Sequence, residues 1–307
     1  MLEDTTKASE ADVIVRPAAG ANVVVDDIDV WADHIEFRNL KINVDFYTKC
    51  SADDVVLRNS SAKLLFIRSS RNVTIVDSEF GDVANSVSQI GPGDSCTFPP
   101  ENVLLERVYM HDYYSSPFNS VHEECLMVTA VIGITIRNSK FHRCEDFDIL
   151  FKRFGTSVDM RDIVMENNWF DDPYPDGTSA IQFSEPDSGS TFTNLLIRNN
   201  SFGATLTMKP EVGYVNARVI GNVGTRYGGP CSGVTSQYNI WSGTPACSST
   251  DLQAPTGFVN QSGFDFHLAP GAAAINRGHP TDFPAIDIDA QARPFGGRAD
   301  AGADERE

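Results

Sequence analysis

A ten-residue phrase recurs eight times along this 307-residue chain, with variable spacing between its copies. Self-similarity at such periods is typical of a stacked repeat architecture, because no single unit can bury its own apolar face. The copies are DHIEFRNLKI from Asp33, DDVVLRNSSA from Asp53, RNVTIVDSEF from Arg71, ENVLLERVYM from Glu101, IGITIRNSKF from Ile132, RDIVMENNWF from Arg161, TNLLIRNNSF from Thr193 and, decayed, VNARVIGNVG from Val215.

Each copy of the phrase predicts a short strand followed by a tight corner. Its third and fifth positions are almost always apolar, as in Val73 and Ile75, and its sixth is often charged, as in Arg137. Apolar residues at alternate positions indicate a strand with one buried face. The seventh position is mostly Asn or Asp, which tolerate left-handed backbone and suit a corner. These corner residues are Asn39, Asn59, Asp77, Asn138, Asn167 and Asn199. The tenth position predicts an internal aromatic stack of Phe80, Phe141, Phe170 and Phe202.

Repeats with a constant phrase and variable connections favour coils whose strands keep register while the turns take insertions. No long stretch has the helical spacing of apolar residues, and Gly and Pro are dense. From about residue 12 to residue 241 the chain resembles the right-handed parallel β-helix superfamily, the pectate-lyase-like fold. The resemblance implies an all-β solenoid over residues 1–241, in which each coil gives two or three short strands to parallel sheets. It also implies a secreted bacterial β-helix repeat protein.

The C-terminal part resembles a closing segment found in secreted bacterial β-helix proteins. Its sequence runs FDFHLAPG from Phe264, AINRG from Ala274 and IDIDAQARPFGGRADAGADE from Ile286. Residues 242–307 are therefore expected to form an irregular capping segment packed on the solenoid, along it or over its C-terminal end. Asp287, Asp289 and Asp300 are assigned to this cap rather than to a metal, because Ca²⁺ needs roughly six to eight converging oxygens.

The charge balance restricts the classes of partner. Lys and Arg number 24 against 42 Asp and Glu, which gives a formal net charge of −18 without a basic cluster. A nucleic-acid groove or an anionic-membrane surface lacks its electrostatic signature here. No apolar run is long enough to span a membrane. The resemblance leaves a polysaccharide as the expected partner of a monomeric protein. The N terminus shows no signal sequence, so we expect a secreted or cell-surface protein whose export signal, with the first coil, lies outside this chain.

Six cysteines occur without a C-x-x-C pair, which argues against a zinc knuckle. Cys231 and Cys247 bracket a loop rich in Gly, Ser and Thr and are predicted to form a disulfide. Cys125 and Cys144 are expected to be buried as small apolar residues.

The richest set of polar residues follows the predicted strands of four successive coils. We expect Cys125 and Met127 to stack inside over Ile149 and Phe151, followed by Ile181 with Phe183 and Leu206 with Met208. Strand alternation then directs the remaining side chains outward on one sheet. These are His122, Glu124, Asp148, Lys152, Gln182, Ser184 and Lys209. Strands about 4.8 Å apart would make Glu124 and Asp148 neighbours.

The polysaccharide lyases that share this fold suggest roles for these residues. They act on acidic polysaccharides by β-elimination, with Ca²⁺ held against the sugar carboxylate. By this resemblance Lys152 or Arg153 is the base, His122 a further catalytic group, and Glu124 with Asp148 the calcium ligands. Gln182 and Lys209 are expected to bind substrate, as are Tyr113 and Tyr114 in an aromatic loop at residues 109–119. A second loop, residues 86–100, is expected to form the opposite wall.

Two other functions remain open. A glycoside hydrolase needs two flanking carboxyl groups, which Glu123, Glu124, Asp146 and Asp148 could supply. A non-catalytic β-helix, serving as a glycan-binding or cell-surface adhesion module, needs only a flat or aromatic-lined groove. In that case the charged face is ordinary solvated surface, and His111 and His122 are surface or turn residues.

Overall fold

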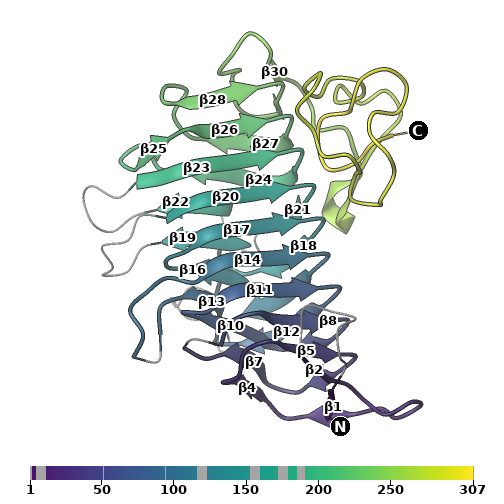
Figure 1. Ribbon diagram of the computed structural model, residues 1–307. Helices are drawn as coiled ribbons and strands as arrows, with labels where there is room; N and C mark the ends of the chain where they lie inside the picture. Colours follow the sequence, from purple (N-terminus) through teal and green to yellow (C-terminus); the bar gives the residue numbers. More distant parts are fainter. Residues whose placement is uncertain are drawn as a thin grey trace.

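The computed structural model describes residues 2–4, 12–50, 52–93, 95–115, 123–152, 160–171, 179–184 and 191–306. Their strands stack coil upon coil into an elongated parallel β-helix (Figure 1), which confirms the expected fold class. Within these residues the single helical element is a 3₁₀ turn, η1 (Gln261–Gly263). None of the described helical segments is long and apolar enough to cross a membrane.

The recurring phrase builds one face of the solenoid, here called ladder A. Its pairs are parallel except β1 with β2, and equivalent positions of the phrase align, as in Val73 opposite Val103. The strands, in order, are β1 (Leu2–Asp4), β2 (Val13–Val15), β5 (Ile35–Arg38), β8 (Val55–Arg58), β11 (Arg71–Val76), β14 (Glu101–Glu106), β17 (Ile132–Arg137), β20 (Met160–Glu166), β23 (Thr191–Arg198), β26 (Ala217–Ile220) and β28 (Val234–Gln237), with β25 (Gly213–Val215) beside β23.

Two further ladders complete each coil, and both are parallel throughout. Ladder B consists of β3 (Val24–Val25), β6 (Lys41–Ile42), β9 (Ser61–Ala62), β12 (Glu79–Ala84), β15 (Tyr109–Tyr114), β18 (Lys140–Cys144), β21 (Trp169–Phe170), β24 (Ser201–Met208), β27 (Val223–Gly228), β29 (Ile240–Trp241) and β30 (Leu252–Gln253). Ladder C consists of β4 (Ile28–Val30), β7 (Asp45–Thr48), β10 (Leu64–Arg68), β13 (Ser88–Gly91), β16 (Leu126–Val128), β19 (Ile149–Lys152) and β22 (Ser179–Ser184), and it joins ladder B at β24.

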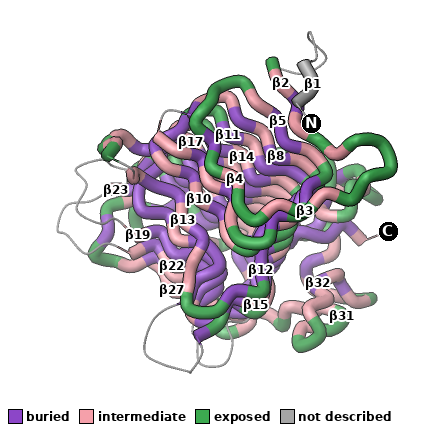
Figure 2. Tube along the Cα trace, turned by 90° about the horizontal axis from the view of Figure 1, so that it is seen from below, coloured by how far each residue is buried: buried purple, intermediate pink, exposed green. Residues whose placement is uncertain are grey.

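The interior between the ladders is apolar, and the strands that enclose it are buried (Figure 2). The predicted aromatic stack forms inside ladder B for three of its four members, because Met110 separates Phe80 from Phe141. The ring centroids of Phe141 and Phe170 lie 5.1 Å apart, and those of Phe170 and Phe202 lie 5.2 Å apart. All three side chains are fully buried.

The predicted corners between ladders A and B are also confirmed. The seventh residue of the phrase has a positive φ in every coil, for example 57° at Asn39 and 50° at Asn199. Asn and Asp accept this left-handed conformation at low cost, and the decayed eighth copy has Gly221 there.

A second row of asparagines, at the eighth position of the phrase, faces inward and was not predicted. The backbone N–H of Asn168 donates to Oδ1 of Asn200 at 3.0 Å, and that of Asn200 donates to Asn222 at the same distance. Each side-chain amide also donates to a carbonyl of the preceding coil, as Asn200 does to Met165 at 2.9 Å. The row, here called the buried amide row, is Asn168, Asn200, Asn222 and Asn239, all fully buried.

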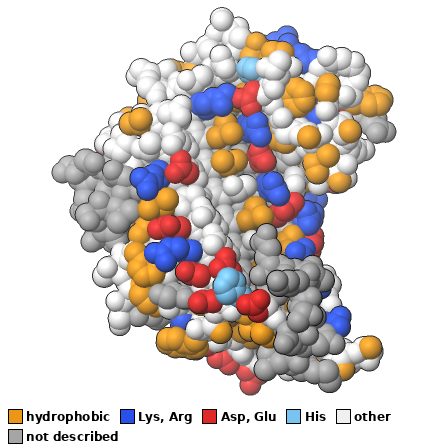
Figure 3. All heavy atoms as spheres, in the orientation of Figure 1, with side chains coloured by type: hydrophobic (Ala, Val, Ile, Leu, Met, Phe, Trp, Pro, Cys, Tyr) orange, Lys and Arg blue, Asp and Glu red, His pale blue; other side chains and the backbone are white. Residues whose placement is uncertain are grey.

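The exterior of ladder A has alternating basic and acidic side chains, as Figure 3 shows along this face of the molecule. Arg137 contacts Glu106 of the preceding coil at 2.9 Å. Arg198 contacts Glu166 at 2.7 Å and Asp282 of the tail at 2.6 Å. Exposed ion pairs of this kind are worth about 0–1 kcal/mol each.

The ladders continue beyond the expected boundary at residue 241, because β30 pairs with β29. The tail that follows contains an antiparallel pair, β31 (Phe258–Asn260) with β32 (Asp265–Leu268). It lies along the side of the upper coils (Figure 1). Its backbone bonds to the corners directly: Gly302 N–H donates to the Gly221 carbonyl at 2.7 Å, and Ala303 N–H donates to Ser201 Oγ at 3.0 Å.

All six cysteines form disulfides. The predicted Cys231–Cys247 bond is confirmed. Cys125 and Cys144 are fully buried as expected, but they are bonded to each other instead of serving as free apolar residues. The third bond joins Cys50 to Cys96.

Removing one member of the buried amide row should destabilise the protein strongly. Asn200→Ala deprives the Asn168 N–H of its acceptor and the Met165 carbonyl of its donor inside the core. We expect a loss of roughly 3 kcal/mol in the free energy of unfolding, because buried unsatisfied groups cost about 1–3 kcal/mol each. Urea unfolding followed by circular dichroism measures it.

The matched control is Asn216→Gly. The Asn216 amide donates to Asn194 at 2.9 Å on the exposed surface, and its backbone has a φ of 54°, which Gly accepts. A loss equal to that of Asn200→Ala would contradict a special role for the buried row.

Candidate functional site

The register of ladder C differs from the expected one at β16. Leu126 and Val128, not Cys125 and Met127, pair with Ile149 and Phe151 and fill the interior. The bonded Cys125 lies just before the strand. A shift of one residue exchanges the two faces of a strand, so Met127 and Leu150 lie outside. The later pairs, Ile181 with Phe183 and Leu206 with Met208, stack inside as expected.

An open cleft of about 540 Å³ lies over this outer face of ladder C. Its floor is apolar, with Phe66, Met127 and Leu150 on three different strands. The predicted residues Glu124 and Lys152 both line it, and Glu123 lines it as well. The remaining wall residues are Asn85, Ser86, Val87 and Gln89. The cleft therefore combines carboxyl groups, an amine and an apolar platform.

Glu123 is the most unusual group in this cleft. Its residue is 1% exposed, and neither carboxyl oxygen has a hydrogen-bond partner among the described residues. Burial, reinforced by the negative charges of Glu124, Glu145 and Asp146, raises the pKa of Glu123 to about 7. A pKa of about 7 means that the carboxyl is mostly protonated only below neutral pH. From the sequence, Glu123 was only one of four candidate carboxyl groups for hydrolysis. Its burial could not be predicted, because it lies in a run of acidic residues.

Several other sequence-predicted residues do not line the cleft. Asp148, just before β19, is fully buried and is not among the residues that line it. Tyr113 is fully buried, and its hydroxyl donates to the Lys63 carbonyl at 3.0 Å, so it cannot bind substrate. Tyr114 is 45% exposed at the end of β15. His122 and Arg153 lie outside the described residues.

Gln182 and Lys209 follow on the next strands of ladder C. Gln182 pairs in register with Leu150 of the cleft floor. Lys209 comes directly after β24, where its N–H donates to the Phe183 carbonyl at 3.2 Å. Neither residue is among those that line the cleft.

Part of each expected loop is a strand. Residues 109–114 form β15 of ladder B, and residues 88–91 form β13 of ladder C. The aromatic residues at 109–114 alternate between core and surface because they belong to a coil. Of the second segment, residues 86–100, Ser86 and Val87 line the cleft outside a strand and Gln89 lines it from β13.

No protein-family model and no curated protein sequence matches the chain. Among solved structures, the chain is similar to one described as the crystal structure of pectate lyase Pel9A. The two are 12% identical, the match covers 96% of this chain and 86% of that chain, and the TM-score is 0.48. This likeness gives no residue of the present chain a role.

Replacing Glu123 should change the pH dependence of stability in a defined direction. The folded protein binds a proton at Glu123 up to a pKa of about 7, whereas the unfolded chain releases it near 4.5. Stability is therefore lost as the pH rises through this window. Glu123→Gln removes that loss. At pH values above about 7 the melting temperature of the variant should therefore be a few degrees higher than that of the wild type.

Below the lower limit of the window both forms are neutral, and the difference in melting temperature should disappear. Thermal unfolding over a pH series measures this difference. A constant difference at every pH would mean that Glu123 titrates normally.

Proposed function

We propose that this protein is a carbohydrate-active enzyme that cleaves an acidic polysaccharide by β-elimination in the cleft on ladder C. The observation that carries the proposal is the buried Glu123 carboxyl, with its pKa of about 7, in an open cleft that also holds Lys152. An acid and an amine over an apolar floor suit a sugar ring bearing a carboxylate. The three disulfides support the proposal that the protein is secreted, because such bonds persist in oxidising compartments.

The proposed reaction needs one base and one acid. In this proposal Lys152 takes the proton α to the sugar carboxyl group. The electron pair forms a carbon–carbon double bond, and the bond to the glycosidic oxygen breaks. Glu123 gives its proton to that oxygen as it leaves. Gln182, which pairs in register with Leu150, would contact the adjoining sugar in this proposal.

The described donors do not fit a calcium ion in this cleft. Among the described residues that line it, Glu124 is the one other carboxylate, burial raises the pKa of Glu123 to about 7, and fully buried Asp148 is not a lining residue. Ca²⁺ takes roughly six to eight oxygens. No step of the proposed reaction therefore runs through calcium.

Hydrolysis is the second candidate, favoured by the presence of Glu124 beside the protonated Glu123. Glycosidases pair a carboxylic acid of raised pKa with a second, ionised carboxylate. A neutral or acidic polysaccharide would serve, and no unsaturated product would form.

The test is an assay of the purified protein on a panel of uronic-acid and neutral polysaccharides, with calcium and with chelator. β-Elimination produces a conjugated unsaturated sugar that absorbs in the ultraviolet, whereas hydrolysis produces only new reducing ends. We expect the unsaturated product, and a loss in kcat/KM of about a hundredfold or more in Glu123→Gln and in Lys152→Met.

Lys140→Met is the matched control, because Lys140 lies over Trp169 on ladder B, away from the cleft. It should retain full activity. New reducing ends without ultraviolet absorbance would show that the reaction is hydrolysis and not elimination. Absence of both products would overturn the enzyme proposal in favour of a glycan-binding module.

A further inference from the structure

Ladder B is kinked at the same place in three successive coils. Asp82, Asp112 and Arg143 all have left-handed backbone, with φ of 57°, 57° and 56°. The residues on either side of the kink stay paired, Gly81 with His111 and Val83 with Tyr113, whereas Asp82 and Asp112 are left out of the pairing. Because a kinked residue breaks the alternation of a strand, His111 and Asp112 both lie outside although they are consecutive. Met110 and Tyr113 on either side are fully buried.

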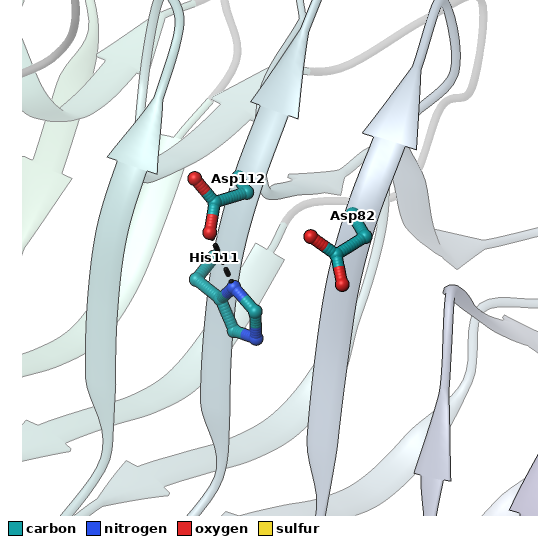
Figure 4. A group of neighbouring side chains, drawn as sticks. All are labelled: Asp82, His111 and Asp112. Carbon is teal, nitrogen blue, oxygen red and sulfur yellow. Dashed lines mark hydrogen bonds and ion pairs between the residues drawn. The ribbon is translucent and has the colours of Figure 1, made fainter.

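The kink gathers metal-ligating groups on the outer face of ladder B. One ligand atom each from Asp82, His111 and Asp112 lies within 4.8 Å of the others. Figure 4 shows the imidazole of His111 extending from its strand toward the neighbouring strand that carries Asp82. Nδ1 of His111 lies 2.7 Å from Asp112 Oδ2, and Nε2 lies 3.0 Å from Glu79 Oε1.

The imidazole is held in place from several sides. A Cβ at Gly81 would come within 3.0 Å of the ring and 2.3 Å of the His111 carbonyl oxygen, so only glycine leaves room for it. Tyr109 stacks on the ring with centroids 4.3 Å apart and planes 21° apart. The side chain of His111 is only 11% exposed. A ligand fixed in this way loses little freedom when it binds an ion.

The group has an excess of negative charge. Glu79, Asp82 and Asp112 surround His111, and Arg143, 2.9 Å from Asp112, is the one permanent cation in an ion pair with them among the described residues. Asp82 makes no hydrogen bond or ion pair within the part of the chain that the structure describes. Carboxylates this close repel one another unless a cation lies between them.

We propose that Asp82, His111 and Asp112 form a binding site for a divalent transition metal ion of the Zn²⁺ class. An imidazole nitrogen combined with carboxylate oxygens suits Zn²⁺ and its neighbours, whereas Ca²⁺ selects oxygen alone. Both ring nitrogens face a carboxylate, so the nitrogen that does not bind the ion keeps a carboxylate partner that orients the ring. Arg143 holds the other oxygen of Asp112 in the same manner.

The site is open on one side. A hollow of about 330 Å³ borders Glu79, Asp82 and His111, and Lys41 and Lys63 form part of its lining. Three protein ligands leave one coordination position free on a tetrahedral ion. Water or a small anion in the hollow can take it, with the two lysines favouring the anion. The site lies on ladder B and shares no residue with the cleft on ladder C, so it does not rest on the proposed enzymatic function.

The test is a titration of the chelator-treated protein with Zn²⁺ by isothermal calorimetry, and with Co²⁺, whose visible absorption reports nitrogen and oxygen coordination. We expect one saturable site, weakened about tenfold or more in His111→Ala and in Asp82→Asn. The Asp82 side chain is exposed and unbonded among the described residues, so Asp82→Asn leaves the fold intact. Circular dichroism checks this.

The matched control is His267→Ala, because His267, Asp289 and Asp304 form the other group of ligating residues in the described chain. It should bind Zn²⁺ as the wild type does. The proposal is overturned if Zn²⁺ does not bind, if Asp82→Asn and His111→Ala bind it unchanged, if His267→Ala abolishes binding, or if Ca²⁺ binds as tightly as Zn²⁺.

Discussion

The hydrogen bonds of the buried amide row fix the register of the upper coils, from Asn168 to Asn239. The apolar interior alone does not distinguish one coil from the next, because Val, Ile and Leu recur at the same positions. A buried amide, by contrast, must find its donor and its acceptor in adjacent coils at one spacing. A one-residue slip would leave these groups unsatisfied and would also turn the apolar faces outward.

Both functional features arise where the coils depart from this regular pattern. The cleft forms where β16 begins after the bonded Cys125, which brings Glu123 and Glu124 beside Lys152. The His111 group forms where three stacked residues adopt left-handed backbone. The regular core supplies the rigid support, and the irregular positions supply side chains that strand alternation alone would keep apart.

The tail packs against the side of the solenoid. It covers the outer face of Trp169, whose ring lies 5.8 Å from Phe264 and 5.7 Å from Phe266. It is held internally by the buried pair of Arg293 and Glu305, and Arg293 also donates to the Gly302 carbonyl at 2.9 Å. An apolar patch on ladder B that would otherwise be exposed is thereby buried.

The sequence by itself determined the parallel coils, the left-handed corners at residues such as Asn39, the phenylalanine stack and the Cys231–Cys247 bond, because these follow from residues close together in the repeat. It also selected Glu124 and Lys152. Only the tertiary structure decided that Asp148 and Tyr113 are buried, that burial raises the pKa of Glu123, and that Asp82 lies beside His111. These properties depend on register and on neighbours from other coils, since one kink or one shifted strand reverses which side chains face solvent.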